Sequence, residues 1–307
     1  MPELPEVETI ARGVDERVRG DRIAQAWFSS FPQPFKTPPE RQAAGLEGRV
    51  VLGVHRCGKH IVVELGGMDG MGSNPVPNHP TDEDLSVGAP DARRMAHPGS
   101  GSVKPEAQWI VHLGMTGRLL VTTPDGPVAA HTHARLSLAS GRELRFVDPR
   151  RFGRLEFRDL RGVAGFNTTG AEPLTIGIEE FAGLFRGRKL CIKAALLNQN
   201  LLAGVGNIYA DESLFRAGIR PGKRAGRLTR AELEQLRLSL REVLHHAIRL
   251  GGSSVSDYVD ADGVRGFFQL EHCVYLRTAL PCRHCATPIK RILVAGRGTH
   301  YCPKCQG

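Results

Sequence analysis

The chain contains 307 residues, carries a formal net charge of +9 and is 41% hydrophobic. This length can bury two domain cores and a small appended module, and no apolar run approaches the roughly 20 residues of a membrane helix. The composition therefore excludes an integral membrane protein, and the acidic N-terminus without an apolar signal segment predicts a cytoplasmic location. The positive charge favours a polyanionic partner, although charge alone fits an ordinary basic protein equally well.

The N-terminal part predicts one helix followed by strands. Apolar residues recur at helical spacing at Val7, Ile10, Ala11, Val14 and Val18. Pro5 suits the first turn of this helix, and Glu6 and Glu8 suit the positive end of its dipole. Short alternating or β-branched segments follow at residues 50–54, 60–65, 109–113, 118–122, 134–138 and 143–147. They predict an antiparallel sandwich or barrel.

Two segments lack this periodicity. Residues 66–108 are rich in Gly, Pro, Ser and Asp, which predicts a disordered surface insertion between two paired strands. An inert insertion is favoured over a regulatory or partner-binding one. Residues 166–175, which include Gly170 and Pro173, are expected to link two domains.

The second half predicts helices. A helix over residues 189–202 would place four apolar residues on one face: Leu190, Ala194, Leu197 and Leu201. The turn Gly204-Val205-Gly206-Asn207 follows, with Asn207 as the expected cap of a helix over 208–217. Such a turn either binds a phosphate or simply joins two helices. Thr229 and Glu232 have the spacing of a capping box before a long amphipathic helix.

Four cysteines near the C-terminus have metal-ligand spacing. Cys282-x-x-Cys285 and Cys302-x-x-Cys305 predict a tetrahedral, structural zinc ion, with a redox pair or unrelated cysteines as the alternatives. Cys57, Cys191 and Cys273 are expected to be small core residues. Between the two pairs we expect a hairpin whose turn carries Arg297, either as a phosphate ligand or as a solvated charge.

The N-terminus offers a nucleophile. Removal of Met1 would leave Pro2 with a secondary amine whose pKa is roughly 8, so that part of it is unprotonated at neutral pH. Such an amine can attack a sugar C1′ and form an iminium ion, and Glu3 could move the protons. Many proteins begin with Met-Pro without using the proline in catalysis, so this motif alone is weak.

Six motifs occur together and in order, and they carry a family resemblance. They are Pro2-Glu3-Leu4-Pro5-Glu6-Val7-Glu8, Lys59, His112-Leu113-Gly114-Met115-Thr116-Gly117, Asp148-Pro149-Arg150-Arg151-Phe152-Gly153, Gly204-Val205-Gly206-Asn207-Ile208-Tyr209-Ala210 and the four cysteines. With them the sequence resembles the bacterial formamidopyrimidine-DNA glycosylase, or DNA-(apurinic or apyrimidinic site) lyase, family. The resemblance implies an α+β fold. Its expected parts are an N-terminal catalytic β-sandwich domain with flanking helices (1–165), a linker (166–175), a helix–two-turn–helix domain (176–268) and a zinc finger (269–307).

The same resemblance implies a base-excision repair activity. The expected partner is double-stranded DNA that contains abasic sites or oxidised purines, chiefly 8-oxoguanine and formamidopyrimidines, and the expected strand cleavage is β,δ-elimination. Pro2 matches the Schiff-base nucleophile, Glu3 the general acid/base and Lys59 a catalytic lysine that contacts phosphate. Glu6 is the matching second acidic residue. The DNA-binding positions are Met115, Arg150 and Phe152, which would fill the space of a flipped nucleotide, and Asn207 and Arg297, which would bind phosphates.

We expect a monomer, and a damaged-base pocket within residues 253–268. The stretch Asn198-Gln199-Asn200 lacks the acidic residue that is common before the turn. The related endonuclease VIII, which prefers oxidised pyrimidines, is the nearest alternative, but Leu4 and Arg150-Arg151-Phe152 favour the purine enzyme. A non-catalytic DNA-damage-binding module is the alternative of another class.

Overall fold

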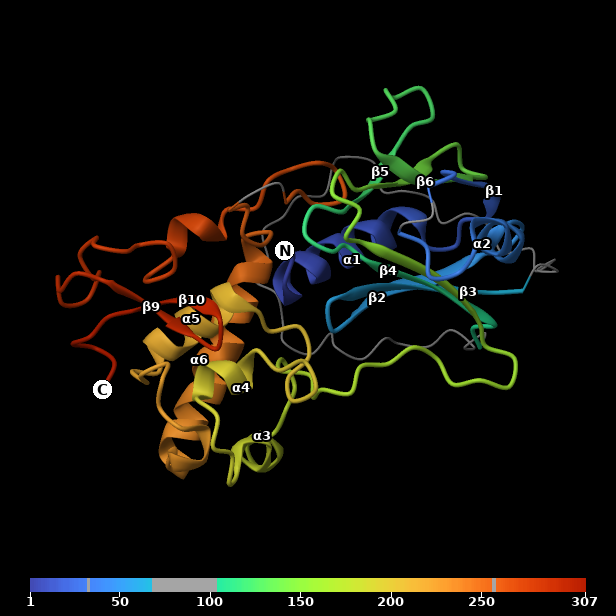
Figure 1. The fold of residues 1–307 in the computed structure, drawn as a ribbon. Helices are drawn as coiled ribbons and strands as arrows, with labels where there is room; N and C mark the ends of the chain where they lie inside the picture. Colours follow the sequence, from blue (N-terminus) through green and yellow to red (C-terminus); the bar gives the residue numbers. More distant parts are fainter. Residues whose placement is uncertain (32–33, 68–103, 256–257) are drawn as a thin grey trace, which may run out of the picture.

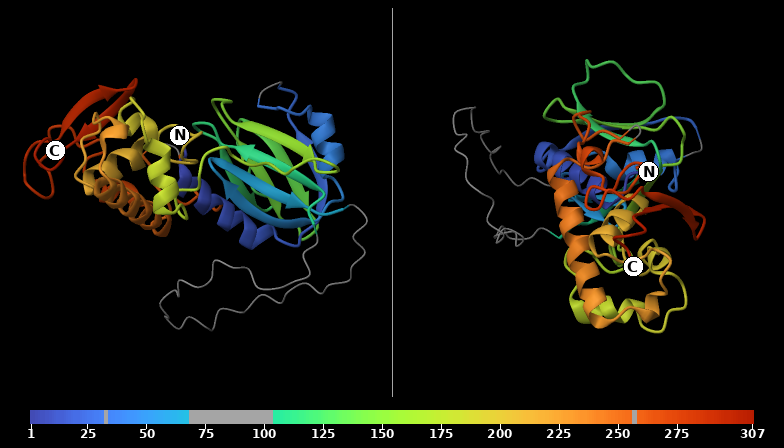
Figure 2. Two further views of the ribbon diagram at one scale, coloured as in Figure 1. Left: turned by 90° about the horizontal axis from the view of Figure 1, so that it is seen from below. Right: turned by 90° about the vertical axis from the view of Figure 1, so that its left-hand side faces the viewer.

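The computed structural model describes residues 1–31, 34–67, 104–255 and 258–307 (Figure 1). A β-sandwich forms one end of the molecule, and helices with a C-terminal hairpin form the other (Figure 2). The N-terminus lies where the two halves meet, whereas the C-terminus lies on the far side of the helical half (Figure 1). Among the described residues, no helix combines the length and the apolar character that crossing a membrane requires.

Two four-stranded antiparallel sheets form the sandwich, so the predicted sandwich is confirmed. One sheet has the order β1 (Ile23–Phe28), β6 (Thr132–Leu138), β7 (Glu143–Val147) and β5 (Arg118–Thr122). The other has the order β2 (Val51–Cys57), β3 (His60–Leu65), β4 (Ala107–His112) and β8 (Arg154–Asp159). The sequence predicted six of these strands and missed β1 and β8. β1 (IAQAWF) lacks a regular alternation of apolar and polar residues, whereas β8 (RLEFRD) has this alternation and was overlooked.

The predicted end of the insertion at residue 108 is wrong. Residues 68–103 lie outside the described part of the chain. Glu106 N–H donates to Leu65 O (2.9 Å) and extends the pairing of β3 with β4, and β4 begins at Ala107. The last residues of the predicted insertion therefore belong to the sandwich.

Helix α1 (Leu4–Val18) joins the two halves. Its predicted apolar stripe, from Val7 to Val18, packs into the sandwich core, while Leu4 belongs to the core of the helical half. Helix α2 (Pro39–Leu46) covers another part of the sandwich through Leu46. Because α1 starts at the boundary, residues 2–6 lie between the two cores.

The helical half contains α3 (Ile178–Phe185), α4 (Ile192–Leu196), α5 (Asn207–Arg216) and α6 (Arg230–Arg249), with short 3-10 turns at Ala225–Arg227 and Phe268–Glu271. The predicted capping box is present before α6: Glu232 N–H donates to Thr229 Oγ1 (3.2 Å), and Thr229 N–H donates to Glu232 Oε2 (2.9 Å). The helix predicted over 189–202 is wrong in its extent. Ala225 N–H donates to Leu190 O (2.9 Å), which holds the preceding segment in an extended pairing, so only five residues form α4.

The C-terminal module is a hairpin of β9 (Lys290–Val294) and β10 (Arg297–Tyr301). Its small core packs against Phe215 of α5 and includes Val274 and Ile289. Ala295 and Gly296 make the turn, so Arg297 is the first residue of β10, one position beyond the turn where the sequence predicted it.

Candidate active site

The predicted nucleophile and acid lie at the junction of the two halves. Pro2 is buried, and Glu3 is 5% exposed. Leu4 N–H donates to Gly204 O (3.0 Å), and Ile208 N–H donates to Glu3 Oε1 (3.2 Å). Within the described part of the chain, Glu3 Oε2 is buried without a hydrogen-bond partner, which leaves this oxygen free for a bound group. The Pro2 nitrogen is here a peptide nitrogen joined to Met1.

The electrostatics of the junction suit proton transfer near neutral pH. Burial raises the pKa of Glu3 to about 7, against the opposing attraction of Lys59, and the neighbouring Glu6 raises it further. Burial lowers the pKa of Lys59, while Glu3 and Glu6 oppose this effect. Glu3 can therefore exist in both protonation states at neutral pH, which a general acid/base requires.

A two-residue turn presents Lys59 to this junction. β2 and β3 pair up to Cys57 and His60, so Gly58 and Lys59 alone connect them. Gly58 has φ of +60°, and a Cβ there would lie 2.8 Å from Thr168 Cγ2. Arg56 Nη1 donates to Gly58 O (3.2 Å). Glycine at 58 thus permits the tight turn that carries Lys59 over the junction.

Glu6 connects the start of α1 to the loop that follows α6. Its carboxylate accepts hydrogen bonds from Glu3 N–H (2.7 Å), Ser253 N–H (2.8 Å) and the Tyr209 hydroxyl. Burial and Glu6 raise the pKa of Tyr209 well above its usual range, so the phenol stays protonated and donates. Sequence reasoning missed Tyr209, although its position inside the Asn207-Ile208-Tyr209 motif was a usable signal.

A small cavity of about 30 Å³ lies beside Pro2. Its lining residues are Met1, Pro2, Glu6, Met115, Ile208, Ser253, Val255 and Tyr258. The structure thus brings the predicted nucleophile, one predicted wedge residue and the start of the predicted base loop to one place. Met1 forms part of the wall, so its removal would enlarge the cavity.

The glycine-rich turn between α4 and α5 fits against Glu3. A Cβ at Gly206 would overlap the Glu3 carboxyl group, and Gly204 has φ of +87°. Asn207 does not cap α5, contrary to the prediction, because Gly206 is the cap and Asn207 is the first helical residue. Asn207 Nδ2 instead donates to Gly298 O of β10 (3.0 Å). Its backbone N–H still lies at the helix N-terminus, where an anion is favoured.

The stretch Asn198-Gln199-Asn200, which lacks the common acidic residue, still supports the glycine-rich turn that follows it. Asn200 N–H donates to Asn198 Oδ1 (3.0 Å), so an amide oxygen accepts the bond that a carboxylate could accept. Gln199 accepts from Gly204 N–H (3.0 Å) and donates to Val205 O (2.8 Å). The missing acidic residue therefore does not disrupt the turn.

The three predicted wedge residues occupy two loops of the sandwich that are fastened together. Met115 is 41% exposed between β4 and β5, and Phe152 is 48% exposed between β7 and β8. The guanidinium of Arg150 lies 4.9 Å from the centre of the Phe152 ring. Buried Asp148 accepts from Thr116 Oγ1 (2.6 Å) in one loop and from the Gly153 N–H (2.7 Å) in the other. Asp148 therefore holds the two loops together. It is the first residue of the motif 148–153, but the sequence alone predicted no role for it.

The four predicted metal ligands form one cluster. Their sulfur atoms all lie within 4.8 Å of one another. Sγ–Sγ distances are 3.9 Å for Cys282–Cys305, 3.5 Å for Cys285–Cys302 and 3.4 Å for Cys285–Cys305. A tetrahedral zinc ion with Zn–S bonds of about 2.3 Å separates its sulfurs by about 3.8 Å, so the cluster fits one zinc ion. Four thiolates leave no open position, and this zinc is structural.

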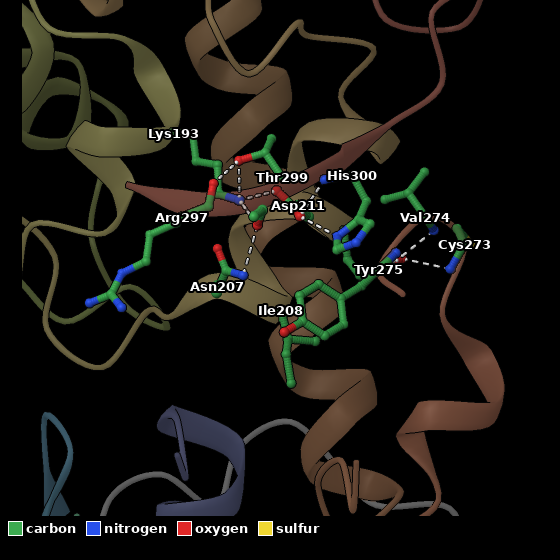
Figure 3. A network of polar contacts seen from close by, with 12 residues as sticks. Lys193, Asn207, Ile208, Asp211, Cys273, Val274, Tyr275, Arg297, Thr299 and His300 are labelled. Carbon is green, nitrogen blue, oxygen red and sulfur yellow. Dashed lines mark hydrogen bonds and ion pairs between the residues drawn. The ribbon is translucent and has the colours of Figure 1, made fainter. Parts of the chain in front are cut away.

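Arg297 on β10 and Asn207 on α5 both belong to the helical half. Arg297 is exposed, and its side chain extends away from the buried contacts around Lys193 (Figure 3). Burial is the main cause of the lowered pKa of Lys59, and Glu3 and Glu6 oppose it. The positive charge of Arg297 lowers this pKa by a smaller amount. The positive charges of Arg297 and Lys59 therefore lie close enough to interact, although the two residues come from different halves of the molecule.

Three family models match successive parts of the chain. The formamidopyrimidine-DNA glycosylase N-terminal domain matches residues 1–155, the H2TH domain of the same glycosylase matches 170–259, and a zinc finger found in FPG and IleRS matches 279–307. A formamidopyrimidine-DNA glycosylase of Solibacter usitatus is 41% identical over all of this chain and 99% of its own length.

Solved structures are similar over nearly the whole chain. A complex of the Lactococcus lactis Fpg with DNA that contains an abasic site aligns with a TM-score of 0.80 and 32% identity, covering 99% of each chain. The MutM (Fpg) protein of Thermus thermophilus aligns with a TM-score of 0.76 and 38% identity, covering 100% of this chain and 99% of its own.

Proposed function

The chain belongs to the formamidopyrimidine-DNA glycosylase family, a family of bifunctional glycosylases and abasic-site lyases, and we propose that it removes oxidised purines from DNA through Pro2. The observation that carries this proposal is the meeting of Pro2, Glu3 and Lys59 at one buried junction beside a cavity. Complexes of the Lactococcus lactis relative with Fapy-dG-containing and abasic DNA support DNA with such lesions as the partner.

In the first chemical step the Pro2 nitrogen replaces the damaged base at the sugar C1′. Once Met1 is removed, the Pro2 amine attacks C1′, the bond from C1′ to the base breaks, and the nitrogen loses its proton. The C1′–O4′ bond then opens, O4′ takes up a proton, and an iminium ion links Pro2 to the ring-opened sugar. The leaving base needs a proton, and Glu3, with a pKa of about 7, can supply it. Lys59 faces the same junction and can bind the neighbouring phosphate.

Two eliminations then open the strand. The iminium ion acidifies the C2′ hydrogen, and its removal expels the 3′ phosphate by cleavage of the C3′–O bond. Loss of a proton from C4′ next expels the 5′ phosphate by cleavage of the C5′–O bond. Glu3 can accept these protons, and water releases the sugar fragment from Pro2 by hydrolysis of the imine.

The remaining site residues are proposed to bind the DNA. Met115, Arg150 and Phe152 would enter the duplex in place of the everted lesion, since exposed loops held by Asp148 can serve as a wedge. Asn207 and Arg297 would bind phosphates from the helical half. In this proposal residues 1–165 form the catalytic domain, 166–175 the linker, 176–268 the helix–two-turn–helix domain and 269–307 the zinc finger. One chain contains every residue of the proposed site, so we predict an active monomer.

A comparison of lesions tests the substrate. Duplexes with one 8-oxoguanine, one formamidopyrimidine or one thymine glycol should be cut with rates that favour both purine lesions, because we propose a purine pocket beside Pro2. Single-turnover cleavage on gels measures the three rates, with an undamaged duplex as the control. Preferential cleavage of thymine glycol would contradict the proposed substrate and favour an oxidised-pyrimidine enzyme.

Replacement of Glu3 tests its role as the acid. Glu3→Gln should lower the rate of 8-oxoguanine release by about 10²–10⁴-fold, because glutamine cannot protonate the leaving base. Glu3 acts as an acid below its pKa of about 7, and the Pro2 amine reacts above its pKa of roughly 8. Wild-type base release should therefore be highest between these two values and fall as the pH rises above about 8. This alkaline limb should be absent in Glu3→Gln.

A substrate without a base provides the control for Glu3. Cleavage of a preformed abasic site requires no departure of a base, so Glu3→Gln should lower that rate less. An alkaline limb that persists unchanged in Glu3→Gln would assign the titration to another group and remove the argument for Glu3 as the acid.

A further inference from the structure

A buried ion pair lies beneath the strand that carries Arg297. Lys193 of α4 and Asp211 of α5 both have fully buried side chains, and Lys193 Nζ lies 2.7 Å from Asp211 Oδ1 (Figure 3). Neither residue belongs to the proposed chemistry. Ion pairs without exposure are costly to desolvate, so this pair needs further polar partners to be tolerated.

Those partners are three successive residues of β10. Lys193 Nζ donates to Gly298 O (3.1 Å) and to Thr299 Oγ1 (2.7 Å). Asp211 Oδ2 accepts from His300 N–H (2.8 Å) and lies 3.3 Å from His300 Nδ1. The ion pair therefore fixes the backbone and side chains of β10 directly after Arg297.

The same contacts reach both proposed phosphate ligands. Thr299 Oγ1, which accepts from Lys193, donates to Arg297 O (3.0 Å). Asn207 Nδ2 donates to Gly298 O, the carbonyl that Lys193 also binds. The Gly298 carbonyl thus connects the ion pair to Asn207 on α5, and the Thr299 hydroxyl connects it to Arg297 on β10.

We propose that Lys193 and Asp211 are positioning residues that hold Asn207 and Arg297 at the spacing of a DNA phosphate. The inference rests on the proposed phosphate-binding function of Arg297. A well-packed apolar pair could fill the same space with similar stability, but it could not fix the direction of β10 through hydrogen bonds. Zinc sets the internal shape of the hairpin, and the ion pair sets its placement on the helical half.

The salt dependence of DNA binding tests this placement. The variant Lys193→Met/Asp211→Asn removes both charges together, keeps an acceptor for His300 N–H and leaves Gly298 O bonded to Asn207. Its affinity for a duplex with a tetrahydrofuran abasic analogue should fall about tenfold, as expected for one lost charge-assisted contact. The slope of log K against log salt should decrease by about 1, as in Arg297→Ala, because one phosphate contact is lost. Combining the variants should add little further loss.

Two controls separate a specific effect on β10 from a general loosening of the module or a loss of zinc. Glu212, the next residue of α5, is also buried and accepts N–H bonds from residues 273–275 of the same module, so Glu212→Gln loosens the attachment without touching β10. This variant removes no hydrogen bond made directly to β10 and should keep the wild-type slope, and an equal decrease would contradict a role specific to the bonds between the ion pair and β10. If the double variant loses zinc, Thr299→Val replaces it, since it cuts only the link from Lys193 to Arg297 O.

The remaining outcomes distinguish this inference from the proposed function. An unchanged slope in Arg297→Ala would overturn the phosphate role of Arg297 itself. A reduced slope in Arg297→Ala together with a wild-type slope in the zinc-loaded double variant would overturn only the positioning role. Fully additive losses in the combined variant would overturn it as well, because they would show that the ion pair does not act through Arg297.

Discussion

Cys282→Ala is expected to abolish zinc binding by the C-terminal module and to weaken lesion binding by at least about 100-fold, or about 2.7 kcal/mol. Three thiolates cannot complete the tetrahedral site. The core of the module is small, with Val274, Ile289 and two of the cysteines packed on Phe215, so the metal supplies most of its folding free energy. Without the fold, β10 no longer holds Arg297 beside Asn207.

Zinc content and the dissociation constant for lesion DNA, measured on the same preparation, check this prediction. Cys273→Ala is the matched control, because Cys273 is a half-buried cysteine of the same module that does not belong to the four-sulfur cluster. The control should retain both zinc and affinity. Wild-type lesion affinity in zinc-free Cys282→Ala would contradict a role of the module in DNA binding.

Local patterns predicted the parts of this fold that local chemistry determines. The stripe from Val7 to Val18 predicted α1, and the Thr229–Glu232 spacing predicted the start of α6. The spacing of the cysteines predicted a cluster that residues 282–305 form almost alone. In each case the residues that interact lie within one element or one short module.

The predictions failed where distant residues decide the outcome. The apolar pattern over 189–202 suits a long helix, but the pairing of Leu190 with Ala225 shortens α4. Asn207 suits a helix cap, yet its side chain bonds Gly298, which is 91 residues away. The ion pair of Lys193 with Asp211 could not be predicted, because each residue alone resembles a solvated charge.

In the candidate site too, local sequence suggested some of the chemistry, whereas contacts between distant residues determine the rest. Pro2 and Glu3 suggested amine and acid chemistry as individual residues, and the family resemblance supplied roles for Lys59 and the wedge. The raised pKa of Glu3 follows from burial between two cores, and the contacts of Glu6 with Ser253 and Tyr209 span more than 200 residues. Tertiary structure alone creates these properties.

The covalent step through Pro2 predicts that blocking its nitrogen eliminates the reaction. A chain that carries an N-terminal extension keeps Pro2 in a peptide bond, so its nitrogen cannot attack C1′. This chain retains Glu3, Lys59 and the zinc module, and protease removal of the extension directly before Pro2 should restore activity. The extension therefore serves as a reversible and matched control for the loss of the amine.

Borohydride trapping on 8-oxoguanine DNA tests this central claim most directly. Intact mass should first establish that Met1 is absent from the processed wild-type protein. Reduction should then give a covalent protein–DNA adduct that maps to peptide 2–12 at its N-terminal nitrogen, and the extended chain should give none. An adduct on Lys59, or equal trapping by the extended chain, would contradict Pro2 as the nucleophile.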